Sequence, residues 1–231
     1  MPTPSAPPAD AARPPLWHTL ALVCFLLLVA AVGTWSSLDR APPTTAGSRI
    51  VAGYLPLLVV NALLALYVAR LGRGQSALSE LVGRRWHTAQ RGLADATLAL
   101  VAGGLIVLTE VAWSAAFGAP DRAWANTLLP RAPLERASWA VVALTVGTCE
   151  ELVYRGYLQR ELGLLARSRV VGLLAQAALF AMAHGQQGGG TVLRSFLYGL
   201  GFGALAHARK SLLPGMLAHV GIDLAAGLLP H

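Results

Sequence analysis

The chain has 231 residues, of which 55% are hydrophobic and only 13% are charged, and its mean hydropathy is +0.55. Soluble globular proteins carry about 25% charged residues, so this composition argues against an ordinary soluble enzyme, a disordered chain and a coiled coil. The apolar residues stand in long runs rather than in alternation, which argues against a transmembrane β-barrel. The composition predicts an all-α fold, a polytopic transmembrane helical bundle.

The formal net charge of +7 would suggest nucleic acid as a partner for a soluble chain. Here the basic residues stand mostly between apolar runs, so we expect them to meet lipid head groups and to set topology, with no nucleic acid bound. Cys24 and Cys149 both lie inside apolar runs. They predict small core residues rather than a disulfide framework or a C-x-x-C site.

Residues 1–15, rich in proline and alanine, predict a disordered N-terminal tail. An uncharged run follows with a tryptophan at each end, which is typical of an uncleaved membrane helix rather than a signal peptide. At about 1.5 Å per residue, a run of this length can cross a hydrocarbon layer of about 30 Å. We expect about seven spans, over the runs Trp17–Trp35, Ile50–Ala69, Leu93–Phe117, Ala137–Gly163, Val170–Gly185, Thr191–Ala208 and Leu212–Leu229.

The arginines are distributed unevenly among the connections. Those after the second, fourth and sixth runs are basic, whereas the first and fifth are poorer in positive charge. The third connection, with Arg122, Arg131 and Arg136, departs from this alternation. By the positive-inside rule we expect a multi-pass protein of the cell inner (cytoplasmic) membrane, with its amino terminus in the cytoplasm.

The fourth run contains two adjacent acids, Glu150 and Glu151, about halfway along its length. An ionisable group at mid-membrane costs at least about 2.5–3.5 kcal/mol, so it is a functional candidate by default. Glu151 and Arg155 are four residues apart and can form an ion pair on one helix face. Glu150 has Tyr154 at that spacing and is therefore the freer carboxylate. The alternative is that both acids only brace Arg155.

Three further ionisable residues stand in later runs. His184 ends the fifth run, where a lone histidine is often only an interfacial or capping residue. His219 and Asp223 lie four residues apart in the last run, where a carboxylate can orient an imidazole. A rise count places His184 on the order of 10 Å from Glu150 along the membrane normal. Packing of the three runs would nevertheless gather an acid and two imidazoles, which suits proton relay, metal binding or catalysis.

Two hydrolytic schemes use such a set. A glutamate beside a histidine can deprotonate a water, while a second histidine or acid stabilises an oxyanion. Alternatively, Glu150, His184 and His219 match the ligand set of a hydrolytic zinc site with an open position. No H-E-x-x-H pattern occurs in the chain, which removes the commonest zinc-protease signature. Both schemes lead to hydrolysis of a peptide or amide bond.

These residues also resemble the motifs of a known family. Glu150-Glu151-Leu-Val-Tyr-Arg155 resembles the E-E-x-x-x-R motif of the CAAX-protease-like (CPBP or Abi) intramembrane proteases, which include the type II CAAX prenyl endopeptidases. Phe180-Ala-Met-Ala-His184 resembles the family's F-x-x-x-H motif, and His219-Val-Gly-Ile-Asp223 its H-x-x-x-N/D motif. The three motifs occur in the family's order, and the resemblance covers about residues 137–229.

The resemblance implies an integral membrane endopeptidase in which Glu150 and His184 activate the attacking water. His219 and the residue at position 223 would stabilise the oxyanion, with Glu151, Arg155 and Phe180 in support. The family has been described both as metal-dependent and as glutamic-type, so the resemblance leaves open whether a zinc ion takes part in the reaction. Position 223 is Asp where the family often has Asn, and an ionised Asp223 would repel an oxyanion. It is then either protonated or serves to orient His219.

From these observations we expect three parts: the tail (1–15), three N-terminal transmembrane helices with their loops (16–136) and a CAAX-protease-like catalytic domain (137–231). The expected partners are membrane lipid and a membrane-associated protein or peptide substrate. The competing functions are a proton-coupled membrane carrier, which would use the same acid and histidines as a relay, and a non-catalytic immunity or scaffold protein of the same family.

Overall fold

The computed structural model describes residues 14–37, 46–71, 77–118 and 127–229, and almost all of these residues are helical. Residues 1–13, most of the predicted tail, lie outside the described residues. The helices are α1 (Leu16–Ser37), α2 (Ala46–Arg49), η1 (Ile50–Tyr54), α3 (Leu55–Leu71), α4 (Ala77–Val82), α5 (Ala89–Phe117), α7 (Pro133–Glu150), η2 (Glu151–Leu158), α8 (Gln159–Leu165), α9 (Arg169–Met182), η3 (Gly185–Gln187), α10 (Gly189–Arg209) and α11 (Leu213–Leu228). The predicted all-α class is confirmed. Two of the segments, η1 and η2, are π-helical, and η3 is a 3₁₀ turn.

Local chemistry explains several helix ends. The Thr88 hydroxyl accepts a hydrogen bond from the Arg91 amide at the start of α5, and the Ser168 hydroxyl accepts one from the Val171 amide at the start of α9. Such N-caps satisfy amides that have no partner inside the helix. Lys210, with a positive φ of 52°, ends α10 in the left-handed conformation. The chain therefore turns sharply between α10 and α11.

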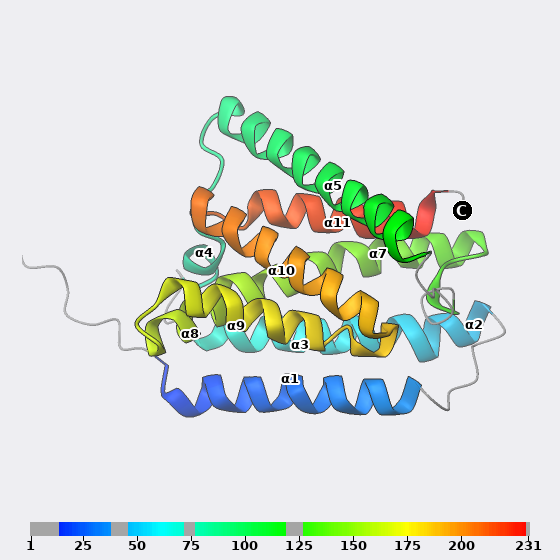
Figure 1. Cartoon of the computed structure of the whole chain (residues 1–231), viewed down its shortest axis with the longest axis horizontal. Helices are drawn as coiled ribbons and strands as arrows, with labels where there is room; N and C mark the ends of the chain where they lie inside the picture. Colours follow the sequence, from blue (N-terminus) through cyan, green and yellow to red (C-terminus); the bar gives the residue numbers. More distant parts are fainter. Residues whose placement is uncertain (1–13, 38–45, 72–76, 119–126, 230–231) are drawn as a thin grey trace, which may run out of the picture.

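Helices α7 and α11 pack against each other, with α3 against α7 and α5 against α11. Helix α9 packs between α8 and α10, and α1 lies along α9 and η3. Figure 1 shows α1 and α5 on opposite sides of the bundle, with successive long helices running in opposite directions. The C-terminal ends of α3, α8 and α10 lie at one end of the bundle (Figure 1). The connections that the sequence shows to be rich in arginine follow these three helices.

Among the described residues, three helical segments are long and apolar enough to cross a membrane: Leu16–Ser36, Ile50–Leu71 and Ala89–Phe117. Helices α9 and α11 are apolar but shorter. Large apolar side chains are exposed along the three long segments, for example Leu28, Leu63 and Leu100. Exposed apolar surface of this extent is typical of contact with lipid. Three of the predicted spans are thus supported, and the total of about seven stays a prediction.

The core surrounds η2, and all eight residues of this segment are buried. Its apolar side chains pack against α1, α3 and α9. The buried cluster consists of Leu22, Leu26, Val68, Val153, Tyr154, Tyr157, Leu158 and Phe180. Because the glutamate and arginine of the E-E-x-x-x-R motif lie on η2, the most tightly enclosed part of the molecule also carries buried charge.

Ion pairs connect the N-terminal helices to the rest, and the first of them is buried. The Arg49 Nε donates to the Glu135 Oε1 at 2.6 Å, and the Glu135 side chain is fully buried. The other oxygen of Glu135 accepts the backbone amides of Arg131 and Ala132. A second pair joins α5 to α10, with the Arg194 Nε 2.9 Å from the Glu110 Oε1. These pairs fix helices that carry no site residue against those that do.

We predict that Glu135→Ala lowers the free energy of unfolding by about 3–5 kcal/mol, because it leaves the buried Arg49 guanidinium without its carboxylate. The measurement is thermal unfolding of the purified protein in detergent. Glu80→Ala, which removes an exposed acid on α4, is the matched control and should leave the unfolding temperature nearly unchanged. Equal unfolding temperatures for the two variants would contradict the stabilising role of Glu135.

Candidate active site

The E-E-x-x-x-R motif spans the junction where α7 passes into the π-helical segment η2. Glu150 is the last residue of α7, Glu151 is the first of η2, and Arg155 follows within the same wide turn. The Arg155 Nη1 lies 2.9 Å from the Glu151 Oε1, and neither side chain is exposed. The predicted ion pair between Glu151 and Arg155 is therefore present. Short π-helical segments occur often at functional sites, because the widened turn redirects side chains.

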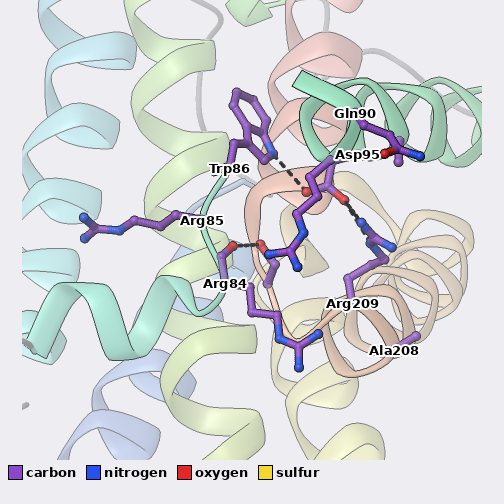
Figure 2. Close-up of a pocket in the computed structure, with 10 residues that line it drawn as sticks. Arg84, Arg85, Trp86, Gln90, Asp95, Ala208 and Arg209 are labelled. Carbon is purple, nitrogen blue, oxygen red and sulfur yellow. Dashed lines mark hydrogen bonds and ion pairs between the residues drawn. The ribbon is translucent and has the colours of Figure 1, made fainter. Parts of the chain in front are cut away.

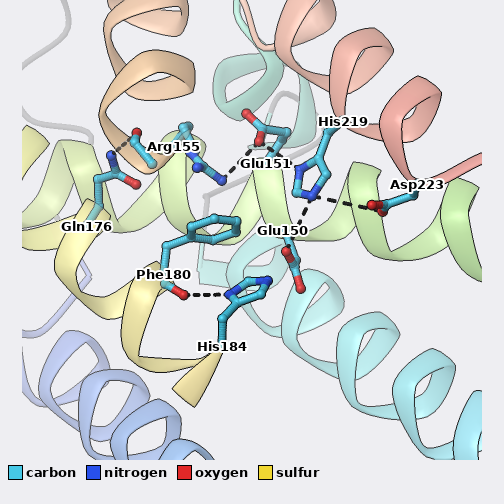
Figure 3. Close-up of polar contacts among 9 residues, drawn as sticks. Glu150, Glu151, Arg155, Gln176, Phe180, His184, His219 and Asp223 are labelled. Carbon is cyan, nitrogen blue, oxygen red and sulfur yellow. Dashed lines mark hydrogen bonds and ion pairs between the residues drawn. The ribbon is translucent and has the colours of Figure 1, made fainter. Parts of the chain in front are cut away.

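His219 of α11 lies between the two consecutive glutamates (Figure 3). Its Nδ1 is 3.1 Å from the Glu151 Oε1, and its Nε2 is 3.7 Å from the Glu150 Oε2. An Nδ1–H that donates to Glu151 leaves Nε2 directed at Glu150. The Glu150 Oε2 is buried and has no hydrogen-bond partner among the described residues. Glu150 is thus the freer carboxylate, as the helical spacing predicted.

Asp223 lies on the same side of the imidazole as Glu150. Its Oδ2 is 3.9 Å from the His219 Nε2, which is too long for a hydrogen bond. Glu151, on a different helix, is the carboxylate at hydrogen-bond distance from His219. The expectation that Asp223 orients the imidazole is therefore replaced by orientation through Glu151. The spacing of four residues along α11 predicted Asp223 as the partner of His219. Spacing within one helix cannot reveal a partner on another helix.

His184 follows the end of α9, and its Nδ1 lies 2.8 Å from the Phe180 carbonyl oxygen. A carbonyl can only accept, so Nδ1 carries the hydrogen, and Nε2 of the neutral ring is an acceptor. Figure 3 shows the imidazole directed toward Glu150 rather than toward the end of the bundle. Helix α9 has only 14 residues, fewer than a full membrane span needs, and His184 follows its end. The separation in depth between His184 and Glu150 stays a prediction.

Two aromatic rings hold these groups in place. The Phe180 ring lies 4.6 Å from the His184 ring and 6.0 Å, edge to face, from the His219 ring. The Arg155 guanidinium lies 4.3 Å from the centre of the Phe180 ring, a cation–π contact. Phe202 of α10 stacks on His219 with its centre at 5.3 Å. Phe180 thus supports both histidines and the arginine, a role that the sequence suggested only through resemblance.

Comparison with known protein families gives a match over the part of the chain that carries the motifs. Residues 132–225 match the family described as type II CAAX prenyl endopeptidase Rce1-like. These residues form an Rce1-like domain. The match covers less than half of the chain and includes α7, η2, α9, α10 and nearly all of α11. Comparisons with curated proteins and with solved structures give no match.

The Rce1-like domain and the apolar helices together indicate a multi-pass membrane protein, and a domain of a protease family implies a protein substrate. All the motif residues named above lie within the matched segment. The resemblance that the sequence shows at its three motifs is confirmed as membership of the Rce1-like domain in this family.

The side chains of the Rce1-like domain do not form a ready metal site. Among the described residues, no group of three or more His, Cys, Asp or Glu side chains is disposed to hold a metal ion. The His184 Nδ1 is engaged by the Phe180 carbonyl and the His219 Nδ1 by Glu151, which leaves the Nε2 of each ring as the nitrogen that a metal could bind. As arranged, however, Glu150, His184 and His219 are not disposed to hold a metal ion together.

Sequence reasoning missed the glycines that let the site close. A Cβ added at Gly215 of α11 would lie 2.8 Å from the Glu151 Oε2. A Cβ at Gly147 of α7 would lie 3.0 Å from the backbone nitrogen of Val220. Both glycines lie where α7 and η2 meet α11. Close helix crossings in membrane proteins commonly use small residues, and this was the signal available in the sequence.

We predict that Gly215→Ala lowers the free energy of unfolding by about 1–3 kcal/mol, because its methyl group overlaps the buried carboxylate of Glu151. The matched control is Gly221→Ala on the same helix, where an added Cβ meets nothing within 4 Å. Thermal unfolding in detergent measures both variants. Unfolding of Gly221→Ala at the lower temperature would contradict the packing described here.

Proposed function

We propose that this protein is an integral membrane endopeptidase that hydrolyses peptide bonds of a membrane-associated substrate with an activated water molecule. The observation that carries the proposal is the Glu150 carboxylate, which has one unpartnered buried oxygen and lies between His219 and His184 (Figure 3). A carboxylate oxygen that is buried without a hydrogen bond is costly, and such groups are retained where they hold or move protons.

In the proposed reaction, Glu150 and the Nε2 of His184 hold the attacking water. Both are acceptors, so together they can bind the two hydrogens of one water molecule and leave an oxygen lone pair for attack. Glu150 takes one proton as that oxygen forms a bond to the carbonyl carbon of the scissile peptide. The role of His184 depends on its Nδ1–H donating to Phe180, because that bond sets the tautomer.

The tetrahedral intermediate carries an oxyanion, which we assign to His219 and Asp223. The carboxylate of Glu151 stabilises a protonated His219, whose Nε2–H then faces the reacting atoms. Asp223 donates a hydrogen bond only while it is protonated. Arg155 offsets the charge of Glu151, so the Glu151 carboxylate does not add a second negative charge near the oxyanion.

Collapse of the intermediate breaks the bond between the carbonyl carbon and the amide nitrogen. The proton held by Glu150 moves to the leaving nitrogen, giving an amine and a new carboxyl group. Glu150 thus acts first as a base and then as an acid, and the residues return to their initial state after the products leave. No other reactant is consumed besides water.

We assign the catalytic unit to residues 137–231 and a supporting role to the three N-terminal helices of residues 16–136. A prenylated protein is a substrate class implied only by the family. The arginine-rich connections at one end of the bundle support an orientation with that end, and the amino terminus, in the cytoplasm. We infer the cell inner membrane as the location.

We predict that Glu150→Gln lowers the rate of substrate cleavage by about 10²–10⁴-fold, because the amide cannot take the proton of water. Quantitative proteomics of membrane fractions from cells with either form identifies the substrates, whose cleavage is then followed with purified protein. Glu161→Gln on α8 is the control for loss of a carboxylate outside the cluster. The variants His184→Ala and His219→Ala should also lose cleavage while still inserting into the membrane.

Two other results would overturn this proposal. Proton-driven flux in liposomes without proteolysis would assign the same residues to a carrier. A biological effect that survives Glu150→Ala would assign the fold to partner binding rather than catalysis.

We predict that Asp223→Asn keeps activity and extends it to higher pH. An amide donates a hydrogen bond to the oxyanion at any pH, whereas Asp223 donates only while it holds a proton. The parent should therefore lose activity as the pH rises through the titration of Asp223, and the variant should lack that decline. The measurement is the pH profile of kcat/KM for both forms. Complete loss of activity in Asp223→Asn at every pH would exclude this role for Asp223.

A further inference from the structure

A second polar site lies away from the candidate active site, where α5 begins and α10 ends. It is a pocket of about 370 Å³ (Figure 2). Four arginines and one acid are among its lining residues, which are Arg84, Arg85, Trp86, Gln90, Arg91, Ala94, Asp95, Ala208, Arg209 and Ser211. None of these residues belongs to the three family motifs.

Backbone contacts fix the shape of this pocket. Gly83 and Ser211 form an isolated antiparallel bridge, and the Arg84 amide donates to the Lys210 carbonyl at 2.9 Å. The Ser211 hydroxyl donates to the Arg84 carbonyl at 2.7 Å. At Gly83, with φ of 78°, an added Cβ would lie 2.4 Å from the Lys210 carbonyl oxygen. The segment before α5 is thereby joined to the turn between α10 and α11.

The acid in the pocket is already neutralised. Asp95 is buried, and its Oδ1 lies 2.6 Å from the Arg209 Nη2 and accepts from the Arg209 Nε at 2.9 Å. Its Oδ2 accepts from the Trp86 Nε1 at 2.9 Å (Figure 2). Asp95 therefore holds Arg209 and Trp86 in position, and it leaves neither oxygen to offset the remaining arginines.

The other arginines leave the pocket positively charged. Within the described part of the chain, no carboxylate forms an ion pair with Arg84, Arg85 or Arg91. Figure 2 shows Arg85 extending away from Asp95 and Arg209. Arg84 and Arg91 also line the pocket and remain to meet a ligand beside Arg209. Guanidinium groups present several donors in a planar fork, which matches the oxygens of a phosphate.

We propose that this pocket binds the phosphate of an anionic phospholipid. The pocket lies at the first turn of α5, one of the three segments able to cross the membrane, and thus at the depth of lipid head groups. Trp86 is partly exposed beside it, as aromatic residues at a membrane interface commonly are. Leu93 and Leu100 of α5 are 70% and 78% exposed, and they offer an apolar surface along which acyl chains can lie. Basic pockets between membrane helices bind anionic head groups in this way.

The test compares lipids that differ only in the head group. Short-chain phosphatidylglycerol and phosphatidylcholine with the same acyl chains are added to the full-length protein in neutral detergent, and the unfolding temperature is measured. We expect a larger upward shift with phosphatidylglycerol. In Arg84→Gln/Arg91→Gln the shift should fall to that seen with phosphatidylcholine. Both side chains are exposed, so the variant is expected to fold.

The matched control is Arg160→Gln/Arg169→Gln, which removes the same charge from exposed positions on α8 and α9. It should retain the full shift with phosphatidylglycerol. An equal loss in both double variants would show a general charge effect and overturn the proposal. Native mass spectrometry gives a second readout, since phosphatidylglycerol should stay bound to the parent and the control but not to the pocket variant.

Inorganic phosphate tests whether the pocket binds the phosphate of a phospholipid or a free phosphate ion. If inorganic phosphate at the same concentration raises the unfolding temperature as much as phosphatidylglycerol does, the pocket is a site for a free anion and the lipid assignment is wrong. The absence of any difference between the two lipids in the parent protein would also overturn it. Neither outcome depends on proteolytic activity.

Discussion

The arrangement of the candidate active site depends on one imidazole, that of His219, which is held between two consecutive carboxylates. Glu151 meets the Nδ1 of His219 and Glu150 faces its Nε2, so α11 must lie directly against the junction of α7 and η2. Gly147 and Gly215 permit this approach, because a side chain at either position would meet α11 or the Glu151 carboxylate. Arg155 then balances the charge of Glu151 inside the bundle. Helix packing and the placement of charge are therefore one constraint, since both glutamates would lose their contact with the His219 imidazole if α11 moved away.

The sequence was sufficient for what depends on composition and on spacing within one helix. It predicted the all-α class, the first apolar helix almost residue for residue, and the ion pair between Glu151 and Arg155. The family motifs also carried the assignment of the Rce1-like domain. Contacts between helices were harder to predict from the sequence. The bond from His219 to Glu151 joins residues 68 positions apart, and no periodicity along either helix reports such a contact.

The length of α9 could not be predicted for a related reason. The apolar run Val170–Gly185 was expected to cross the whole layer, whereas α9 has only 14 residues. The π-helical form of η2 was equally invisible, because hydrophobic periodicity over eight buried residues does not separate one helix type from another. In both cases the surrounding helices decide the geometry, through packing that a single segment does not encode.

The wide turn of η2 also makes the motif sensitive to chain length. Its backbone bonds close over five residues, as between the Gln159 amide and the Tyr154 carbonyl, instead of the four of an α-helix. Deleting one residue between Glu151 and Arg155 would let the turn relax to an ordinary α-helix at little cost in backbone bonding. The helices downstream would stay nearly in phase, because the narrower turn absorbs the missing residue. An inserted residue that the turn does not absorb would instead rotate everything downstream by about 100° about the helix axis. At this point an insertion should therefore be tolerated far less than a deletion.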